Sequence, residues 1–267
     1  MNINIIDVSD THVNSHVGLL PPKVQLDDGG VKEYNVVQKF IWESWIDFWQ
    51  RVNGLRGYKI GVFKGDILDL DPGQRISNNR TDIIKMALAA YEPALDILDT
   101  KFVVRGTEYH AGIAAELEEN FAKYIGAKQH PETGNYAWWR LPMNINGILL
   151  DFAHHTNIGS LPWTETNSLI RLIYQTILEC EHDNTPVPNI ISRGHVHRHV
   201  DTYNIHPRIR AYTTNSWQHK TAYGHKRATD KSVTYGGSII TITDNKYDIE
   251  HVTYHAKKDY IWKLELN

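Results

Sequence analysis

Short apolar runs recur along the chain, and each ends abruptly in polar side chains that can carry chemistry. Runs rich in β-branched residues predict buried strands, here over 5–8, 58–63, 101–105, 145–152 and 190–191. Apolar side chains at helical spacing predict helices between these runs, over 34–52, 81–99, 112–125 and 169–180, with an interruption near Pro93. Strands and helices that alternate in this way predict an α/β fold.

The pattern changes after residue 200, where short Thr-, Tyr- and Ile-rich stretches alternate with turns. These stretches predict β-hairpins with strands over 238–243, 247–253 and 260–266. We find no internal repeat, low-complexity tract or linker. We therefore expect a single domain over 1–267, with the strand-end motifs in 5–200 and a β-rich segment over 200–267.

Composition narrows the class of protein. A hydrophobic share of 41% with 22% charged residues is typical of a globular protein with a sizeable core. No apolar run approaches the roughly 20 residues of a membrane span, and no secretory signal is visible, so we expect a cytoplasmic protein without a membrane partner. The single cysteine, Cys180, agrees with a reducing compartment. The net charge of −3 argues against sequence-blind binding of nucleic acid, whereas 15 histidines suit metal ligation.

The first strand ends in Asp10-Thr11-His12. Residues i and i+2 of an extended chain point to the same side, so Asp10 and His12 can converge. A carboxylate and an imidazole together suit a divalent transition metal. Because ligands bind at the carboxyl edge of an α/β sheet, polar residues at other strand ends are expected to join them.

In order along the chain, these strand ends resemble the motifs of the calcineurin-like metallophosphoesterase superfamily. The matching residues are Asp10-Thr11-His12, Gly65-Asp66-Ile67-Leu68-Asp69, Gly106-Thr107-Glu108-Tyr109-His110, His154 and Gly194-His195-Val196-His197. The resemblance implies a two-sheet β sandwich flanked by helices, in four α/β/β/α layers. It also implies two divalent transition-metal ions, with Mn²⁺ first and Fe, Zn or Ni as alternatives.

Carried over residue by residue, the resemblance implies that the first metal is held by Asp10, His12 and His197. The second is held by His154 and His195, and Asp66 bridges the two. His155 adjoins His154 and stays open as the alternative ligand. Asp69 is expected to be a second-shell or helix-capping residue.

The third motif departs from the family pattern. Thr107 stands where the metal-binding Asn is expected, and Glu108 stands where the catalytic His is expected. Thr107 offers a hydroxyl oxygen to the second metal, and Glu108 offers a carboxylate, which is the better ligand. Imidazole titrates near neutrality, so we expect His110 to be the general acid and Glu108 to supply the metal-binding oxygen.

The function implied is a metal-dependent phosphoesterase in which a metal-bridging hydroxide attacks a phosphate ester. The basic segment 198–231, with Arg198, Arg208 and Arg210, follows the last motif and favours a phosphodiester of nucleic acid or a nucleotide as substrate. The alternatives are a phosphomonoesterase or protein phosphatase, and a binding protein that keeps the fold but has lost catalysis. The oligomeric state stays open.

Overall fold

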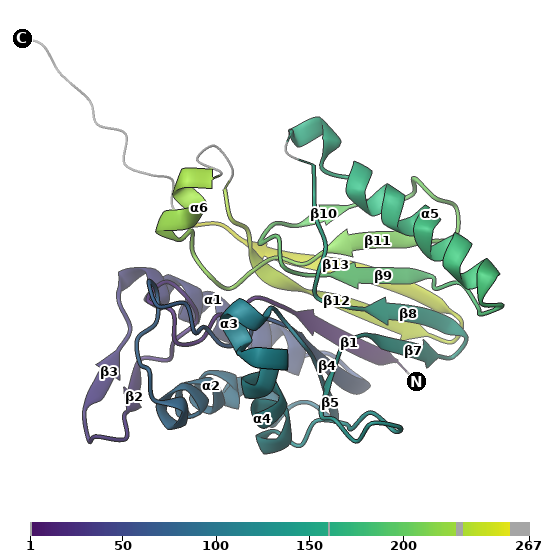
Figure 1. Cartoon of the computed structure of the whole chain (residues 1–267). Helices are drawn as coiled ribbons and strands as arrows, with labels where there is room; N and C mark the ends of the chain where they lie inside the picture. Colours follow the sequence, from purple (N-terminus) through teal and green to yellow (C-terminus); the bar gives the residue numbers. More distant parts are fainter. Residues whose placement is uncertain (1, 160, 228–231, 257–267) are drawn as a thin grey trace, which may run out of the picture.

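Two β-sheets pack face to face, with helices on both outer surfaces (Figure 1). The structure is a computed structural model that describes residues 2–159, 161–227 and 232–256. The six-stranded sheet has the order β13-β12-β1-β4-β5-β6, and the five-stranded sheet has the order β10-β11-β9-β8-β7. A separate hairpin pairs β2 with β3. The expected two-sheet sandwich is confirmed.

The strands of the larger sheet are β1 (Ile3–Val8), β4 (Tyr58–Lys64), β5 (Thr100–Val104), β6 (Ala137–Trp138), β12 (Tyr235–Thr243) and β13 (Lys246–Tyr254). Those of the smaller sheet are β7 (Leu141–Ile145), β8 (Ile148–Phe152), β9 (Ile190–Arg193), β10 (Val200–Asp201) and β11 (Arg210–Thr213). The separate hairpin comprises β2 (Lys23–Gln25) and β3 (Val31–Glu33). The helices are α1 (Val36–Asn53), α2 (Arg80–Leu95), α3 (Glu108–Ala111), α4 (Glu116–Tyr124), α5 (Asn167–His182) and α6 (Ala222–Arg227).

Three apolar clusters fill the spaces between the four layers. The first lies between α1, α2 and α4 and the outer face of the larger sheet, where Trp45 and Phe63 are fully buried. The second lies between the two sheets and joins side chains such as Ile5 and Phe152. The third packs Leu169 of α5 against the smaller sheet. Each sheet is thus covered on both faces, which agrees with its parallel strands.

A buried polar link joins the two sheets inside the second cluster. Lys64 Nζ lies 3.0 Å from Asp7 Oδ1, and the hydroxyls of Ser192 and Tyr212 both donate to Asp7 Oδ2. Asp7 and Lys64 belong to the larger sheet, whereas Ser192 and Tyr212 belong to the smaller one. Removing one partner of a buried ion pair is costly, so this link fixes how the sheets face each other.

The run 145–152 is not one strand. The chain reverses at Asn146-Gly147, where φ is 50° and 84°, and the run is divided between the antiparallel strands β7 and β8. An Asn-Gly pair favours such a two-residue hairpin because both positions accept positive φ. The apolar residues on either side of the pair concealed this turn.

Several predicted boundaries were also wrong. Pro93 lies inside α2, which ends at Leu95, so no second helix begins at Pro93. The helix expected over 112–125 begins as a 3-10 turn, and α4 starts only at Glu116. The stretch 13–30, whose Gly, Pro and Asp residues are typical of an irregular loop, contains strand β2. Tyr223-Gly224, which the sequence favours as a turn, belongs to α6.

The segment after residue 200 contributes to both sheets. Strands β10 and β11 join the smaller sheet, and β12 and β13 form one edge of the larger sheet, where β12 pairs with β1. The expected strand over 260–266 lies outside the described residues. Within the described residues, no helix combines the length and apolar character that crossing a membrane requires.

Candidate metal centre

The carboxyl ends of strands from both sheets meet at one edge of the sandwich and deliver the same types of side chain. In the larger sheet β1 and β4 run parallel, and in the smaller sheet β8 and β9 run parallel. The loops that follow these four strands carry carboxylates and imidazoles, namely Asp10, His12, Asp66, His154, His195 and His197. All six are brought together by the fold.

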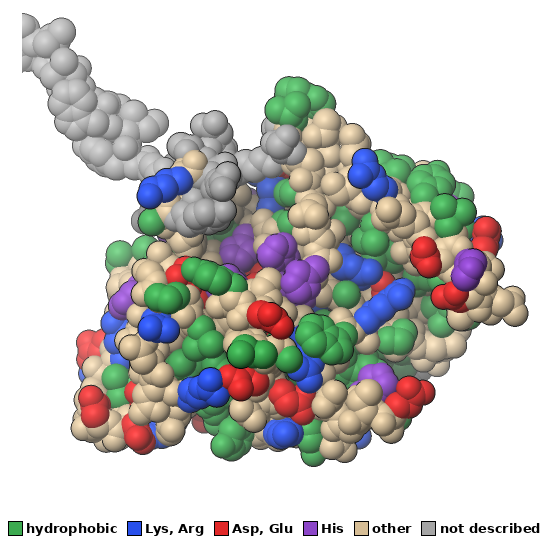
Figure 2. Space-filling model, in the orientation of Figure 1, with side chains coloured by type: hydrophobic (Ala, Val, Ile, Leu, Met, Phe, Trp, Pro, Cys, Tyr) green, Lys and Arg blue, Asp and Glu red, His purple; other side chains and the backbone are tan. Residues whose placement is uncertain are grey.

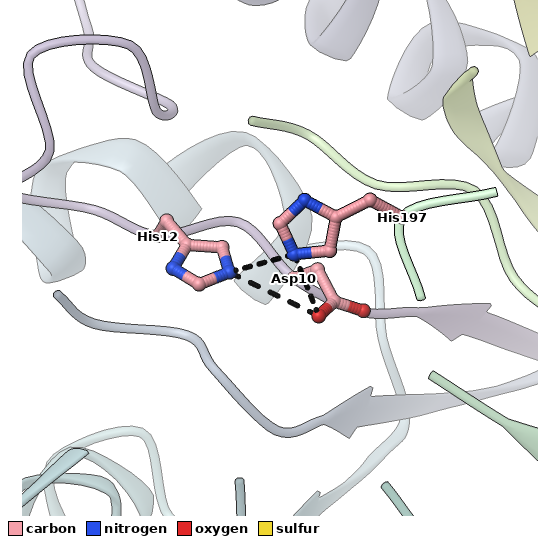
Figure 3. A group of neighbouring side chains, drawn as sticks. All are labelled: Asp10, His12 and His197. Carbon is pink, nitrogen blue, oxygen red and sulfur yellow. Dashed lines mark hydrogen bonds and ion pairs between the residues drawn. The ribbon is translucent and has the colours of Figure 1, made fainter. Parts of the chain in front are cut away.

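Asp10 lies at the centre of this cluster. Its Oδ2 accepts hydrogen bonds from the Ser9 hydroxyl and the His195 backbone N–H. Its Oδ1 is buried without a hydrogen-bond partner and lies 3.3 Å from His197 Nε2 and 3.9 Å from His12 Nε2. Figure 3 shows the two rings and the carboxylate converging on one point. A buried, unpaired carboxylate oxygen beside imidazole nitrogens is an arrangement that calls for a cation.

Asp66 and His154 form the second half of the cluster. Thr107 donates to Asp66 Oδ1 through its backbone N–H and its hydroxyl, at 2.6 and 2.9 Å. The other oxygen, Oδ2, lies 3.1 Å from His154 Nε2. His154 Nδ1 lies 3.0 Å from the Lys64 carbonyl, to which we assign its N–H, so Nε2 is the nitrogen that could bind a metal ion. That nitrogen is buried, lacks a hydrogen bond of good geometry, and lies 3.9 Å from Asp10 Oδ1.

Three overlapping groups of donors can each hold an ion, and within each group the donor atoms lie within 4.8 Å of one another. The groups are Asp10, His12 and His197; His12, Asp66 and His110; and Asp66, His154 and His195. Imidazole and carboxylate donors suit transition metals better than Mg²⁺ or Ca²⁺. Together with the unpaired buried atoms, this donor set fits divalent transition-metal ions.

The carboxylates raise the pKa values of the neighbouring imidazoles. Burial lowers the pKa of His12, but its contacts with Asp10 and Asp69 raise that pKa to about 10. Burial also lowers the pKa of His154, but the charges of Asp66 and Asp10 raise it to about 9. Protons on these rings would therefore compete with a metal ion for the ring nitrogens.

The backbone is strained where the ligand candidates lie. Asp10, His12, Asp66, His195 and His197 have φ values of 57°, 44°, 49°, 73° and 52°, in the left-handed region that non-glycine residues avoid. Each costs about 1–2 kcal/mol relative to ordinary backbone. Strain concentrated at one point of a fold is a feature of functional sites.

Two glycines allow the loops to approach so closely. Gly65 has φ of 66°, and a Cβ there would collide with the His154 ring and the Gly106 backbone. A Cβ at Gly106 would collide with Asp66. Glycine before Asp66 and before Thr107 is therefore a steric requirement of this packing.

The residues of the third motif, Thr107, Glu108 and His110, lie in different places relative to the cluster. The Thr107 hydroxyl donates to Asp66, and Thr107 precedes the short helix α3. The Glu108 carboxylate is exposed and accepts from the Ala114 N–H at 3.2 Å, so the structure does not bring Glu108 into the cluster. It does bring in His110, whose ring lies edge-on to the His12 ring at 4.5 Å between centroids.

Asp69 positions two of these rings. Its Oδ1 lies 2.9 Å from His110 Nδ1, and its Oδ2 lies 3.5 Å from His12 Nδ1. Gln218 Nε2 donates to the same Oδ2 at 3.2 Å, so the carboxylate is itself held in place. This geometry agrees with the expectation that Asp69 supports the ligands. His155 is exposed, whereas His154 is buried.

Glu118 is a buried residue that the sequence did not reveal. From α4 it accepts hydrogen bonds from the backbone N–H groups of Ile67, at 3.0 Å, and Gly106, at 2.6 Å. It thereby ties together the loops that carry Asp66 and Thr107. Burial, and then the charge of Asp66, raise the pKa of Glu118 to about 7. In the sequence, Glu118 is recognisable only as one residue of a predicted amphipathic helix.

Of the three arginines expected to bind substrate, the structure brings one to the centre. Arg198 lines the cavity beside the cluster, and its Nε donates to Glu165 at 3.1 Å. Arg210 opens β11 opposite Ile190, at the amino end of β9, and is bound to Asp201 at 2.7 Å. Arg208 is exposed in the loop before β11. Strand β11 thus separates two of the arginines from the last motif.

A fourth group of possible donors, His199, Asp201 and His251, is satisfied within the protein. His199 Nδ1 lies 2.8 Å from the Thr213 carbonyl, and His251 Nε2 lies 2.8 Å from Asp201 Oδ2. The Arg210 guanidinium supplies the positive charge that Asp201 needs. We interpret this group as an ion-pair network that joins the edges of the two sheets.

No family model and no curated protein sequence matches the chain. Among solved structures, it is similar to Vps29 from Entamoeba histolytica in complex with Zn²⁺, at 13% identity, with a TM-score of 0.44 and coverage of 95% of this chain and 99% of that one. A predicted phosphoesterase from Streptococcus pneumoniae gives 11% identity, a TM-score of 0.39 and coverage of 95% and 94%. The Haemophilus influenzae NAD nucleotidase gives 10% identity, a TM-score of 0.42, and coverage of 94% of this chain and 55% of that one.

These similarities concern the arrangement of elements and leave the function to be argued from the site. The two-sheet architecture agrees with the fold that the resemblance to the calcineurin-like metallophosphoesterase superfamily implies.

Proposed function

We propose that this chain is a metal-dependent phosphoesterase with two divalent transition-metal ions, Mn²⁺ being the first candidate and Fe, Zn or Ni the alternatives. Asp10, His12 and His197 would hold the first ion, His154 and His195 would hold the second, and Asp66 is the candidate to bind both. The observation that carries the proposal is that Asp10 Oδ1 and His154 Nε2 are buried without a hydrogen bond, 3.9 Å apart, in a cluster of strained residues. Such ions polarise phosphoryl oxygens and make water a nucleophile at neutral pH.

The residues around the ions have separate tasks. Thr107 fixes one oxygen of Asp66, so the other oxygen keeps its place against His154. His110 acts as general acid, because Asp69 holds its Nδ1 and leaves Nε2 to give a proton to the ester oxygen. His110 also lines the cavity in which an ester would lie.

The substrate is a phosphate ester. A nucleic-acid backbone as substrate loses much of its support, since Arg208 and Arg210 lie away from the cavity and Arg210 is neutralised by Asp201. A small phosphodiester or phosphomonoester is compatible with what remains.

A binding protein without catalysis is the second candidate. It is favoured by the third motif, in which the Thr107 hydroxyl is engaged by Asp66 and Glu108 by a backbone N–H. Neither residue then supplies the metal-binding oxygen that the resemblance implies.

Metal content and turnover decide between the two. Purified protein is stripped with chelator, reloaded with Mn²⁺ and analysed for metal. It is then assayed on p-nitrophenyl phosphate, bis-p-nitrophenyl phosphate, cyclic nucleotides, and single- and double-stranded DNA. About two ions per chain with turnover that disappears on chelation supports the phosphoesterase. Bound metal without turnover on the whole panel favours the binding protein, and no bound metal rejects both the centre and the enzyme.

A further inference from the structure

A cavity of about 610 Å³ opens beside the metal centre. Asp69, His110, His195 and His197 line its inner end. Figure 2 shows histidine side chains gathered in a hollow on this face of the molecule. Its volume lies within the roughly 300–1,000 Å³ of sites that enclose small molecules.

Beyond the cluster, the lining of the cavity combines apolar side chains with charged ones. Ile158, Val196 and Val233 contribute apolar surface. Arg198 and Lys220 contribute positive charge, and Arg198 Nε donates to Glu165 at 3.1 Å. A phosphate ester at the centre therefore places its organic part against apolar side chains.

Tyr109 gives this apolar lining a flat surface of fixed orientation. The side chain is 62% exposed, yet its hydroxyl donates to Asp71 Oδ1 at 2.9 Å. Its ring also meets the His110 ring edge-on at 5.1 Å between centroids. An exposed aromatic ring that is held at both ends loses little freedom when a second flat ring stacks on it.

We propose that Tyr109 is a specificity-determining residue that stacks on the base of a nucleotide-sized phosphate ester at the metal centre. The inference rests on the proposed function for the position of the phosphate. It goes further in naming a nucleoside as the organic part and in taking one nucleotide rather than a polymer as the substrate. Stacking of a base on an aromatic side chain is worth a factor of about 5 to 150 in affinity.

The test compares Tyr109→Ala, Tyr109→Phe and the control Tyr124→Ala, all loaded with Mn²⁺. Tyr124 is 68% exposed and lies at the end of α4, outside the cavity lining. Binding of AMP is measured by calorimetry, and KM and kcat are measured for AMP, 2′,3′-cyclic AMP and glycerol 2-phosphate. Tyr109→Ala should weaken AMP binding and raise the nucleotide KM by about 5- to 150-fold, with kcat and the glycerol phosphate KM unchanged. Tyr109→Phe keeps the ring and should stay near wild type.

The binding arm separates this inference from the proposed function. AMP binding that depends on Tyr109 without turnover supports the inference and contradicts the enzyme. Turnover of glycerol phosphate without Tyr109-dependent binding of AMP contradicts the inference and keeps the enzyme. The inference is also overturned if Tyr109→Phe loses as much as Tyr109→Ala, or if a single-stranded oligonucleotide binds about tenfold more tightly than AMP.

Discussion

Asp66→Asn tests the metal centre without any knowledge of the substrate. Asp66 Oδ2 lies 3.1 Å from His154 Nε2 and belongs to two of the three donor groups of the cluster. Thr107 already engages Oδ1, so the uncharged amide of Asn has either its nitrogen or its oxygen at the position facing the ions. Both arrangements remove the negative charge that would screen two cations from each other. We expect the variant to lose most metal-induced stabilisation.

The size of that loss follows from linkage. An ion at one hundred times its dissociation constant stabilises the folded chain by about 2.7 kcal/mol per site. For a chain of this length, 1 kcal/mol shifts the melting temperature by roughly 2–4 °C. One occupied site is therefore worth roughly 5–10 °C, and two sites about twice that. A variant that loses both ions should show almost no shift.

The assay is thermal unfolding of metal-free protein with and without Mn²⁺ or Zn²⁺, with metal content measured after desalting. Asp248→Asn, an exposed position on β13, controls for the change in net charge. His154→Ala and His155→Ala form a second pair, in which the buried His154 should matter and the exposed His155 should not. The proposed role of Asp66 is refuted if Asp66→Asn keeps both ions and its melting temperature rises on metal addition by as much as that of the wild type.

Three further predictions address other residues. His110→Ala should lower kcat by roughly 10²–10⁴ for an ester with a poor leaving group and much less for p-nitrophenyl phosphate, because only the poor leaving group needs a proton. The metal content should stay constant in His110→Ala and in Glu108→Ala. Loss of metal in His110→Ala would show instead that His110 is a metal ligand. Glu118→Gln should lower the free energy of unfolding of the metal-free protein by about 1–3 kcal/mol, because the amide nitrogen of Gln cannot accept a hydrogen bond from a backbone N–H. An unchanged midpoint of urea unfolding would contradict this. Burial and the adjacent His251 lower the pKa of His199 to about 4, below its ordinary 6.5. Its contribution to stability is therefore complete above pH 6.5 and is lost as the pH falls towards 4, by at most about 3 kcal/mol. His199→Gln should flatten urea unfolding energies over that range, and a slope equal to wild type would exclude His199 as the cause.

The sequence predicted the parts of the centre that depend on local geometry. Asp10 and His12 follow β1 at i, i+2 spacing, and their side chains do approach each other, but both residues have positive φ, so turns of the backbone and not strand alternation bring them together. The junctions after β4, β8 and β9 could be recognised in the same way. Glu118 could not, because its role depends on two backbone N–H groups that come near only when α4 packs against the sheet. The expectation that Arg210 binds substrate was wrong for a related reason. Arg210 follows the last motif closely in sequence, but β11 places it at the far end of the sheet.

Helix phase explains the third motif. Carried over position by position, the family pattern puts the residue next to Thr107 into the centre, and that residue is Glu108. Here the chain enters a helical turn immediately after Thr107, with the N–H of Ala111 bonded to the Thr107 carbonyl. In such a turn the residue three positions on lies above the starting residue, so His110 returns to the side of Thr107 while Glu108 faces solvent. The imidazole therefore lies three positions after Thr107 instead of directly after it, and it still reaches the centre although the sequence departs from the family motif.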